Sequence, residues 1–183
     1  MTNTETCMRE MRLIQALFLR SSDFDEKWIL FKAFLNTLHS LSDTDKVARG
    51  EFRKDLTMHF SLVLRNIFHH QPKKWKFGKH DVYPTKLSIS ANQEGARVSA
   101  GLSLVIQKDT LEDPEVKKSL ASKSAAQVKI LEQVTTTMQT PIVVENLIEY
   151  IYRFIEDYCK RTNQYDVRYD SEGRSYVRLQ SNL

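Results

Sequence analysis

Positively charged and aromatic side chains alternate within one segment of this 183-residue chain, from Arg65 to Lys86. The segment has six lysines or arginines and one acid, a formal charge of +5, whereas the whole chain carries only +4. Lysines neutralise phosphates, and exposed aromatic rings stack on unpaired bases, so this combination predicts a surface that binds a polyanion. The candidate nucleic-acid-binding residues here are Lys73, Lys74, Trp75, Lys76, Phe77, Lys79 and Lys86.

The same pattern also has an explanation in which no ligand takes part. Trp75 and Phe77 are two residues apart, so on an edge strand they would share one face and pack on the helices. Lys74, Lys76 and His80 would then be solvated and would keep that edge from aggregating. Lysine-rich segments also bind anionic membranes or acidic protein surfaces, so either is a further candidate partner. Lysines without arginine forks favour phosphate contacts over the reading of base edges.

A second candidate surface lies in the C-terminal hairpin that alternation predicts over residues 165–180. Arg168 falls on the face opposite Tyr165, and Arg178 falls beside Tyr176 on the polar face of the following strand. Guanidinium and phenol rings both stack on bases, so Arg168 and Arg178 are candidates to extend an RNA-binding surface. Three acids in the same stretch offset this charge and favour a salt-bridged face toward solvent.

No recognisable motif indicates catalysis or metal binding. His69, His70, His80 and Asp81 lack a spacing typical of zinc ligands, and no cysteine is near them. The chain has no phosphate-cradling glycine loop, no nucleophile elbow and no zinc-protease helix motif. We therefore predict a protein that is not an enzyme and needs no cofactor and no metal. An enzyme whose site is assembled from scattered residues is an alternative.

Composition places the chain among ordinary globular proteins, with 41% apolar and 27% charged residues. No apolar run reaches the roughly 18 residues that a membrane span needs, and the N-terminus does not resemble a secretory signal. Cys7 and Cys159 are far apart in the sequence and are interpreted as reduced thiols. These features predict a cytoplasmic or nuclear protein that is neither secreted nor membrane-spanning.

Apolar periodicity near 3.6 predicts five helices. The first covers about 5–20, and the second begins at Ser22 or Asp23 with acids in its first turn. The third runs from Ser42–Asp43 to about residue 70, the fourth over about 115–137, and the fifth begins at Thr140–Pro141. The apolar stripes of the first three contain large side chains, which predicts a shared core rich in aromatic residues.

Alternation with period 2 predicts two β-hairpins, over 87–106 and 165–180, with turns at Asn92–Gly95 and Asp170–Gly173. The outward face of the first hairpin holds only small residues, which allows close approach of another element, internal or from a partner. These residues are Ser88, Ser90, Ser99, Gly101 and Ser103. The predicted fold class is α+β, with five helices packed on a four-stranded antiparallel sheet made of the two hairpins.

We expect a single domain over 1–183, with a helical part 5–70, the basic segment and hairpin 71–107, helices 114–162 and the C-terminal hairpin 165–180. RNA is favoured over duplex DNA as the partner, because no predicted helix has a basic face suited to the major groove. The main alternative is a protein–protein interaction subunit of adaptor or matrix type. In size and lack of catalytic motifs the chain resembles small viral accessory or matrix proteins, a resemblance of type only. The sequence leaves homo-oligomerisation open.

Overall fold

The computed structural model describes residues 3–70, 82–92, 95–162, 165–169 and 175–179, and within these ranges the chain is mostly helical. The helices are α1 (Asn3–Arg20), α2 (Phe24–Thr44), α3 (Lys46–Lys54), α4 (Leu56–His70), α5 (Lys108–Glu112), α6 (Pro114–Ala121), α7 (Ala125–Thr137) and α8 (Val144–Thr162). The strands are β1 (Val82–Asn92), β2 (Gly95–Ile106), β3 (Ile142–Val143), β4 (Tyr165–Tyr169) and β5 (Ser175–Leu179). None of the described helices is both long enough and apolar enough to cross a membrane.

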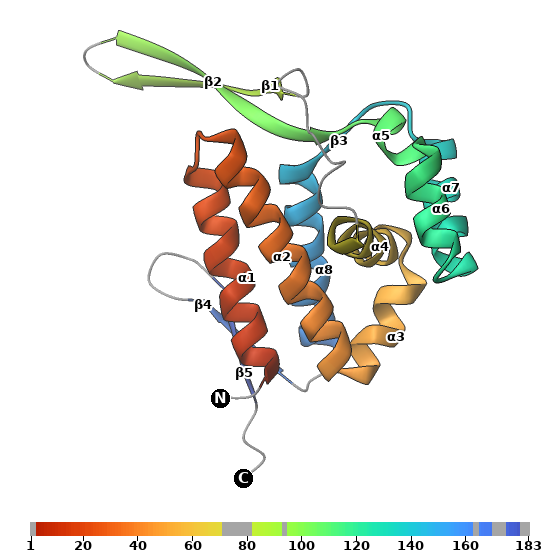
Figure 1. The fold of residues 1–183 in the computed structure, drawn as a ribbon. Helices are drawn as coiled ribbons and strands as arrows, with labels where there is room; N and C mark the ends of the chain where they lie inside the picture. The colour runs from red at the N-terminus through yellow and green to blue at the C-terminus, as the bar shows by residue number, and fades with distance from the viewer. Residues whose placement is uncertain (1–2, 71–81, 93–94, 163–164, 170–174, 180–183) are drawn as a thin grey trace.

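The helices enclose one core that is rich in aromatic side chains, as their apolar stripes predicted. α1 and α2 lie side by side, and α4 packs against α2 (Figure 1). The rings of Trp28 and Phe68 meet edge-on with centroids 4.7 Å apart, and Phe31 lies 5.9 Å from Phe68. Cys7 and Cys159 are buried in the same core as free thiols.

The predicted fold class is wrong, because the two hairpins do not combine into one four-stranded sheet. β1 and β2 pair with each other, and the two residues of β3 pair with the last two residues of β2. β4 pairs only with β5 among the described strands. β3 leads into the first turn of α8, whereas β4 follows its last turn. The 19 residues of α8 span about 28 Å at 1.5 Å per residue, so this helix holds the two hairpins apart.

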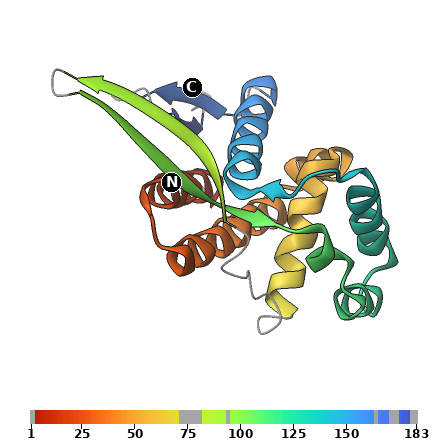
Figure 2. The ribbon, with the colours of Figure 1, turned by 90° about the horizontal axis from the view of Figure 1, so that it is seen from above.

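Both hairpins nevertheless form with the predicted alternation. In the first, Ile89 is opposite Val98 and Asn92 is opposite Gly95, with a register shift between Pro84 and Lys86. This hairpin extends away from the helices (Figures 1 and 2). In the second, β5 lies against α1 and β4 against α8. The centres of both predicted turns, 93–94 and 170–174, lie outside the described residues.

The predicted third helix, 43–70, is divided in two by Asp55. α2 continues through Thr44, Asp45 caps α3, and Asp55 has extended backbone angles of φ −90° and ψ 125°. One carboxylate oxygen of Asp55 accepts a hydrogen bond of 2.9 Å from the backbone N–H of Met58, so this residue ends α3 and caps α4. The start of α2 was predicted correctly, because Asp23 accepts from the N–H of Glu26 at 2.7 Å.

The predicted helix 115–137 is also divided. α6 ends at Ala121 and α7 begins at Ala125, with Ser124 in extended conformation between them. The predicted helix start at Thr140–Pro141 is wrong, since Ile142 and Val143 instead form β3 and α8 begins at Val144. The pairing of β3 with the buried end of β2 fixes this segment as a strand before the helix begins.

Candidate anion-binding face

The structure places three of the nine predicted nucleic-acid-binding residues. Lys86 lies in β1, with its backbone paired to Gly101. Arg168 and Arg178 lie in β4 and β5, where Arg168 is paired with Tyr176 and Arg178 with Asp166. Lys86 and these arginines belong to separate sheets, so they do not form one surface on a common sheet. The other six predicted residues, Lys73, Lys74, Trp75, Lys76, Phe77 and Lys79, lie outside the described residues.

A polar cleft of about 260 Å³ lies at the seam between α2 and α4. Lys32 and Asn36 are one helical turn apart on α2, and Arg65 and His69 are one turn apart on α4, so the two helices present these side chains to one another. No acid is among the lining residues. Phe68 also lines the cleft but is 4% exposed and packs on Trp28. Phosphate contact therefore fits this cleft better than base stacking.

The guanidinium of Arg65 is held by neutral partners. Its Nε donates to the Oδ1 of Asn36 at 3.3 Å, and its Nη1 donates to the Oδ1 of Asn66 at 3.2 Å. These bonds use two of the five N–H groups of an arginine and leave its charge uncompensated by any carboxylate in the cleft. Such a side chain is held in position and can still donate hydrogen bonds to an anion.

A second, smaller cleft of about 140 Å³ lies farther along α2 and α4, where α3 and α7 meet them. Arginines, histidines and neutral polar residues predominate in it, with one acid. The lining residues are His39, Ser42, Asp43, Arg49, Arg53, His59, Leu62, Val63, Asn66 and Gln127.

The single acid of this second cleft is already neutralised. Asp43 receives Arg49 at 2.8 Å and the Nδ1 of His39 at 3.0 Å. Arg49 also donates through Nε to the carbonyl oxygen of Ser42 at 2.8 Å. Arg53, in contrast, has no acidic partner among the described residues.

Both histidines of the second cleft lie in a positive electrostatic environment. Burial lowers the pKa of His39, and the charges of Arg65 and Arg49 lower it further against the opposing effect of Asp43. Burial likewise lowers the pKa of His59, helped by the charge of Arg53. The imidazoles are therefore neutral at pH 7, while the fixed charges around them are mainly positive.

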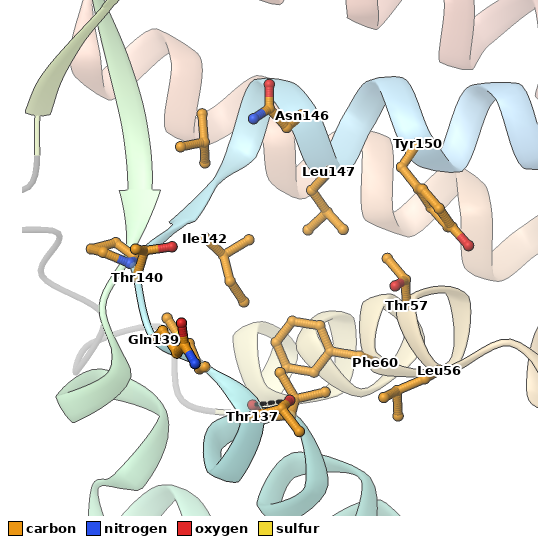
Figure 3. Close-up of a pocket in the computed structure, with 14 residues that line it drawn as sticks. Leu56, Thr57, Phe60, Thr137, Gln139, Thr140, Ile142, Asn146, Leu147 and Tyr150 are labelled. Carbon is orange, nitrogen blue, oxygen red and sulfur yellow. Dashed lines mark hydrogen bonds between the residues drawn. The ribbon is translucent and has the colours of Figure 1, made fainter.

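A third cavity, of about 510 Å³, lies between α4, α7, α8 and β3 and is mainly apolar (Figure 3). Phe60, Ile142 and Leu147 point into it, and no charged residue is among its lining residues. At one side, the hydroxyl of Tyr150 donates to the Oδ2 of Asp55 at 2.7 Å. Burial and then Asp55 raise the pKa of Tyr150, so this phenol stays protonated at neutral pH. This cavity does not suit a polyanion.

Nucleophiles and metal ligands are not gathered anywhere in the described part of the chain. Burial raises the pKa of Cys159 to about 12 and also raises the pKa of Cys7, so neither thiol ionises readily. Among the described residues, no three histidine, cysteine, aspartate or glutamate side chains converge in a way that could hold a metal ion.

Sequence reasoning found the basic segment after α4 but missed Lys32, Asn36, Arg49 and Arg53. The available signal was the polar spacing 32, 36, 39 and 43 along the second predicted helix, which marks one of its faces. That spacing alone does not distinguish a cleft from an ordinary solvated face, because a cleft forms only where α3 and α4 lie opposite this face of α2.

No protein-family model matches this chain, and neither a curated protein nor a solved structure matches it.

Proposed function

We propose that this protein binds single-stranded RNA through its backbone phosphates and catalyses no reaction on it. The observation that supports this most directly is the acid-free cleft at the α2–α4 seam, where Lys32 and Arg65 face one another. α4 ends at His70, one residue before the lysine-rich segment 71–79 begins. Lys32 and Arg65 are far apart in the sequence but line one cleft. The most basic stretch of the chain begins directly after the helix that contains Arg65.

The chemistry of these groups favours phosphate over base recognition. Lysine ammonium groups act as point charges toward phosphate, and Arg65 has three N–H groups beyond those given to Asn36 and Asn66. The cleft is concave and lies between two helices, whereas duplex DNA is read by an element that projects into a groove. A flexible single strand can follow a concave cationic surface, and stacking on Trp75 or Phe77 would add affinity.

The test is to change Lys74, Lys76 and Lys79 together to glutamate and to measure binding of a single-stranded RNA oligonucleotide. We expect binding to be lost while far-ultraviolet circular dichroism and the melting temperature are unchanged. Phosphate contacts by these three lysines should contribute about −2 to the log–log salt slope of wild type. Trp75→Ala should weaken binding by about 1–3 kcal/mol at an unchanged slope if the ring stacks on a base.

The matched control carries the same charge reversals elsewhere, at Lys108, Lys118 and Lys129 on α5, α6 and α7. It should retain most of the RNA affinity. Binding to vesicles containing anionic lipid, measured beside RNA, distinguishes a membrane surface from a nucleic acid. Wild type that binds neither RNA nor such vesicles at low salt would refute the proposal.

An assembly role is the second candidate, favoured by the long β1–β2 hairpin that reaches away from the helices (Figures 1 and 2). An isolated two-stranded hairpin is marginally stable in water, which favours a further element beside it. Ser88 and Ser99 are directly opposite one another in the register, and small residues allow close approach. Light scattering on the full chain, and on a variant in which a two-residue turn replaces 88–99, tests this role. An assembly that persists without those residues would contradict it.

A further inference from the structure

The small cleft between α2, α3, α4 and α7 differs from an ordinary polar surface in being a pocket with an inner wall. Val63, which is 1% exposed, lines its buried side. Its volume is about 140 Å³, which accommodates a tetrahedral oxyanion.

Four side chains from three helices supply hydrogen-bond donors to this pocket. Arg53 from α3 carries an uncompensated charge, and His59 from α4 is a donor when protonated. Asn66 uses its Oδ1 to accept from Arg65, which leaves its N–H₂ group to donate outward. Gln127 from α7 offers a second amide. Donors outnumber acceptors because the carboxylate of Asp43 is already shared between Arg49 and His39.

We infer that this pocket binds a phosphate monoester group. A monoester carries up to two negative charges at neutral pH, presents three terminal oxygens and has a substituent on only one side. A phosphodiester within a strand carries one negative charge and has a nucleoside on both sides, so it matches this set of donors less well. The source is either a free phosphate compound or the 5′-terminal phosphate of a strand, and the second source rests on the proposed RNA binding.

Proton uptake should accompany binding. His39 faces Asp43 on its own helix, Arg49 on α3 and Arg65 on α4, while His59 faces Arg53 on α3. A dianion beside these imidazoles favours their charged forms and therefore raises the pKa of both. The variant Arg53→Gln, which removes the cation beside His59, serves as the reference.

The first measurement follows the imidazole signals of the full chain by NMR as pH is varied, in inorganic phosphate and in chloride of equal ionic strength. Phosphate should raise the pKa of His59 and His39. Arg53→Gln should abolish most of this rise. Lys54→Gln removes the same charge from the adjacent residue, which lies outside the pocket, and should retain the rise.

The second measurement compares two single-stranded RNAs of one sequence, with a 5′-phosphate or a 5′-hydroxyl. The phosphorylated strand should bind roughly tenfold more tightly, because one charge-assisted hydrogen bond changes an affinity by about that factor. Arg53→Gln should remove the difference. A pKa rise in inorganic phosphate without preference for the phosphorylated strand would confirm the pocket and assign its ligand to free phosphate compounds.

The inference is overturned if phosphate raises the pKa of neither His39 nor His59, or raises both equally in wild type and in Arg53→Gln. Its failure is distinguishable from failure of the proposed function. A protein that binds 5′-hydroxyl RNA without any histidine response would keep the proposed function and lose the pocket. A protein that responds to phosphate but binds no RNA would keep the pocket and lose the proposed function.

Discussion

α4 has concave surfaces on two of its sides, and their chemistry is opposite. On one side, Arg65 and His69 face α2 across a cleft without acids. On the other side, Leu56 and Phe60 border a larger cavity that has no charged lining residue. The difference teaches that volume and positive charge are distributed separately around α4. The smaller clefts hold cations and free donors, whereas the largest of the three cavities described here is mainly apolar.

The largest expected effect concerns the apolar side. Phe60 on α4 is 2% exposed and belongs to the hydrophobic core, so Phe60→Ala should lower the free energy of unfolding by about 3–5 kcal/mol. RNA affinity of the folded fraction should not change. Urea unfolding, followed by circular dichroism, checks the first expectation. A loss below about 1 kcal/mol would show that this side chain is not tightly packed.

The next effect concerns Asp55, which caps α4 and accepts a hydrogen bond from the hydroxyl of Tyr150 on α8. Asp55→Ala should destabilise the protein by about 1–3 kcal/mol, from the lost cap and the lost hydrogen bond. Tyr150→Phe removes the hydrogen bonds of the phenol with Asp55 and Thr57 but keeps the cap, and should cost about 0.5–1.5 kcal/mol. Equal losses in the two variants would contradict the capping role. Thermal unfolding of both variants beside wild type provides the comparison.

A smaller effect concerns pH and belongs to the cationic side. The folded-state pKa values of His39 and His59 are lowered, so the unfolded chain binds protons more readily than the folded one. Their contribution to stability is complete above the unfolded pKa of about 6.5 and is lost as pH falls from there through the lowered folded-state pKa. The melting temperature should therefore decline as pH falls below about 6.5, and less steeply in the double variant His39→Gln/His59→Gln. An equal decline in both proteins would assign the effect to other groups.

The sequence was sufficient for local features with a strong periodic signal. The aromatic stripes, the cap at Asp23 and the pairing of Ile89 with Val98 all follow from it. The break at Asp55 did not follow, because Phe52, Leu56 and Phe60 continue the four-residue apolar spacing straight through it. Periodicity records which face is apolar and is unaffected when one residue between two helices adopts an extended conformation.

Features that depend on distant partners were beyond the reach of sequence patterns. β3 has two residues, and only its pairing with Val105 and Ile106 makes it a strand. Likewise, Lys32 gains its significance from Arg65 on another helix. The separation of the two hairpins depends on where α8 begins and ends, which the alternation within each hairpin does not reveal.

The central claim is that the α2–α4 cleft contributes phosphate contacts to RNA binding, and the salt dependence of affinity tests it most directly. The double variant Lys32→Gln/Arg65→Gln is compared with Lys54→Gln/Arg153→Gln, which loses the same charge outside the cleft. Each lost contact reduces the log–log salt slope for a single strand by about 0.7, so the cleft variant should lose about 1.4 and the control almost nothing. Equal slopes in the two variants would show that only net charge matters and would contradict the claim.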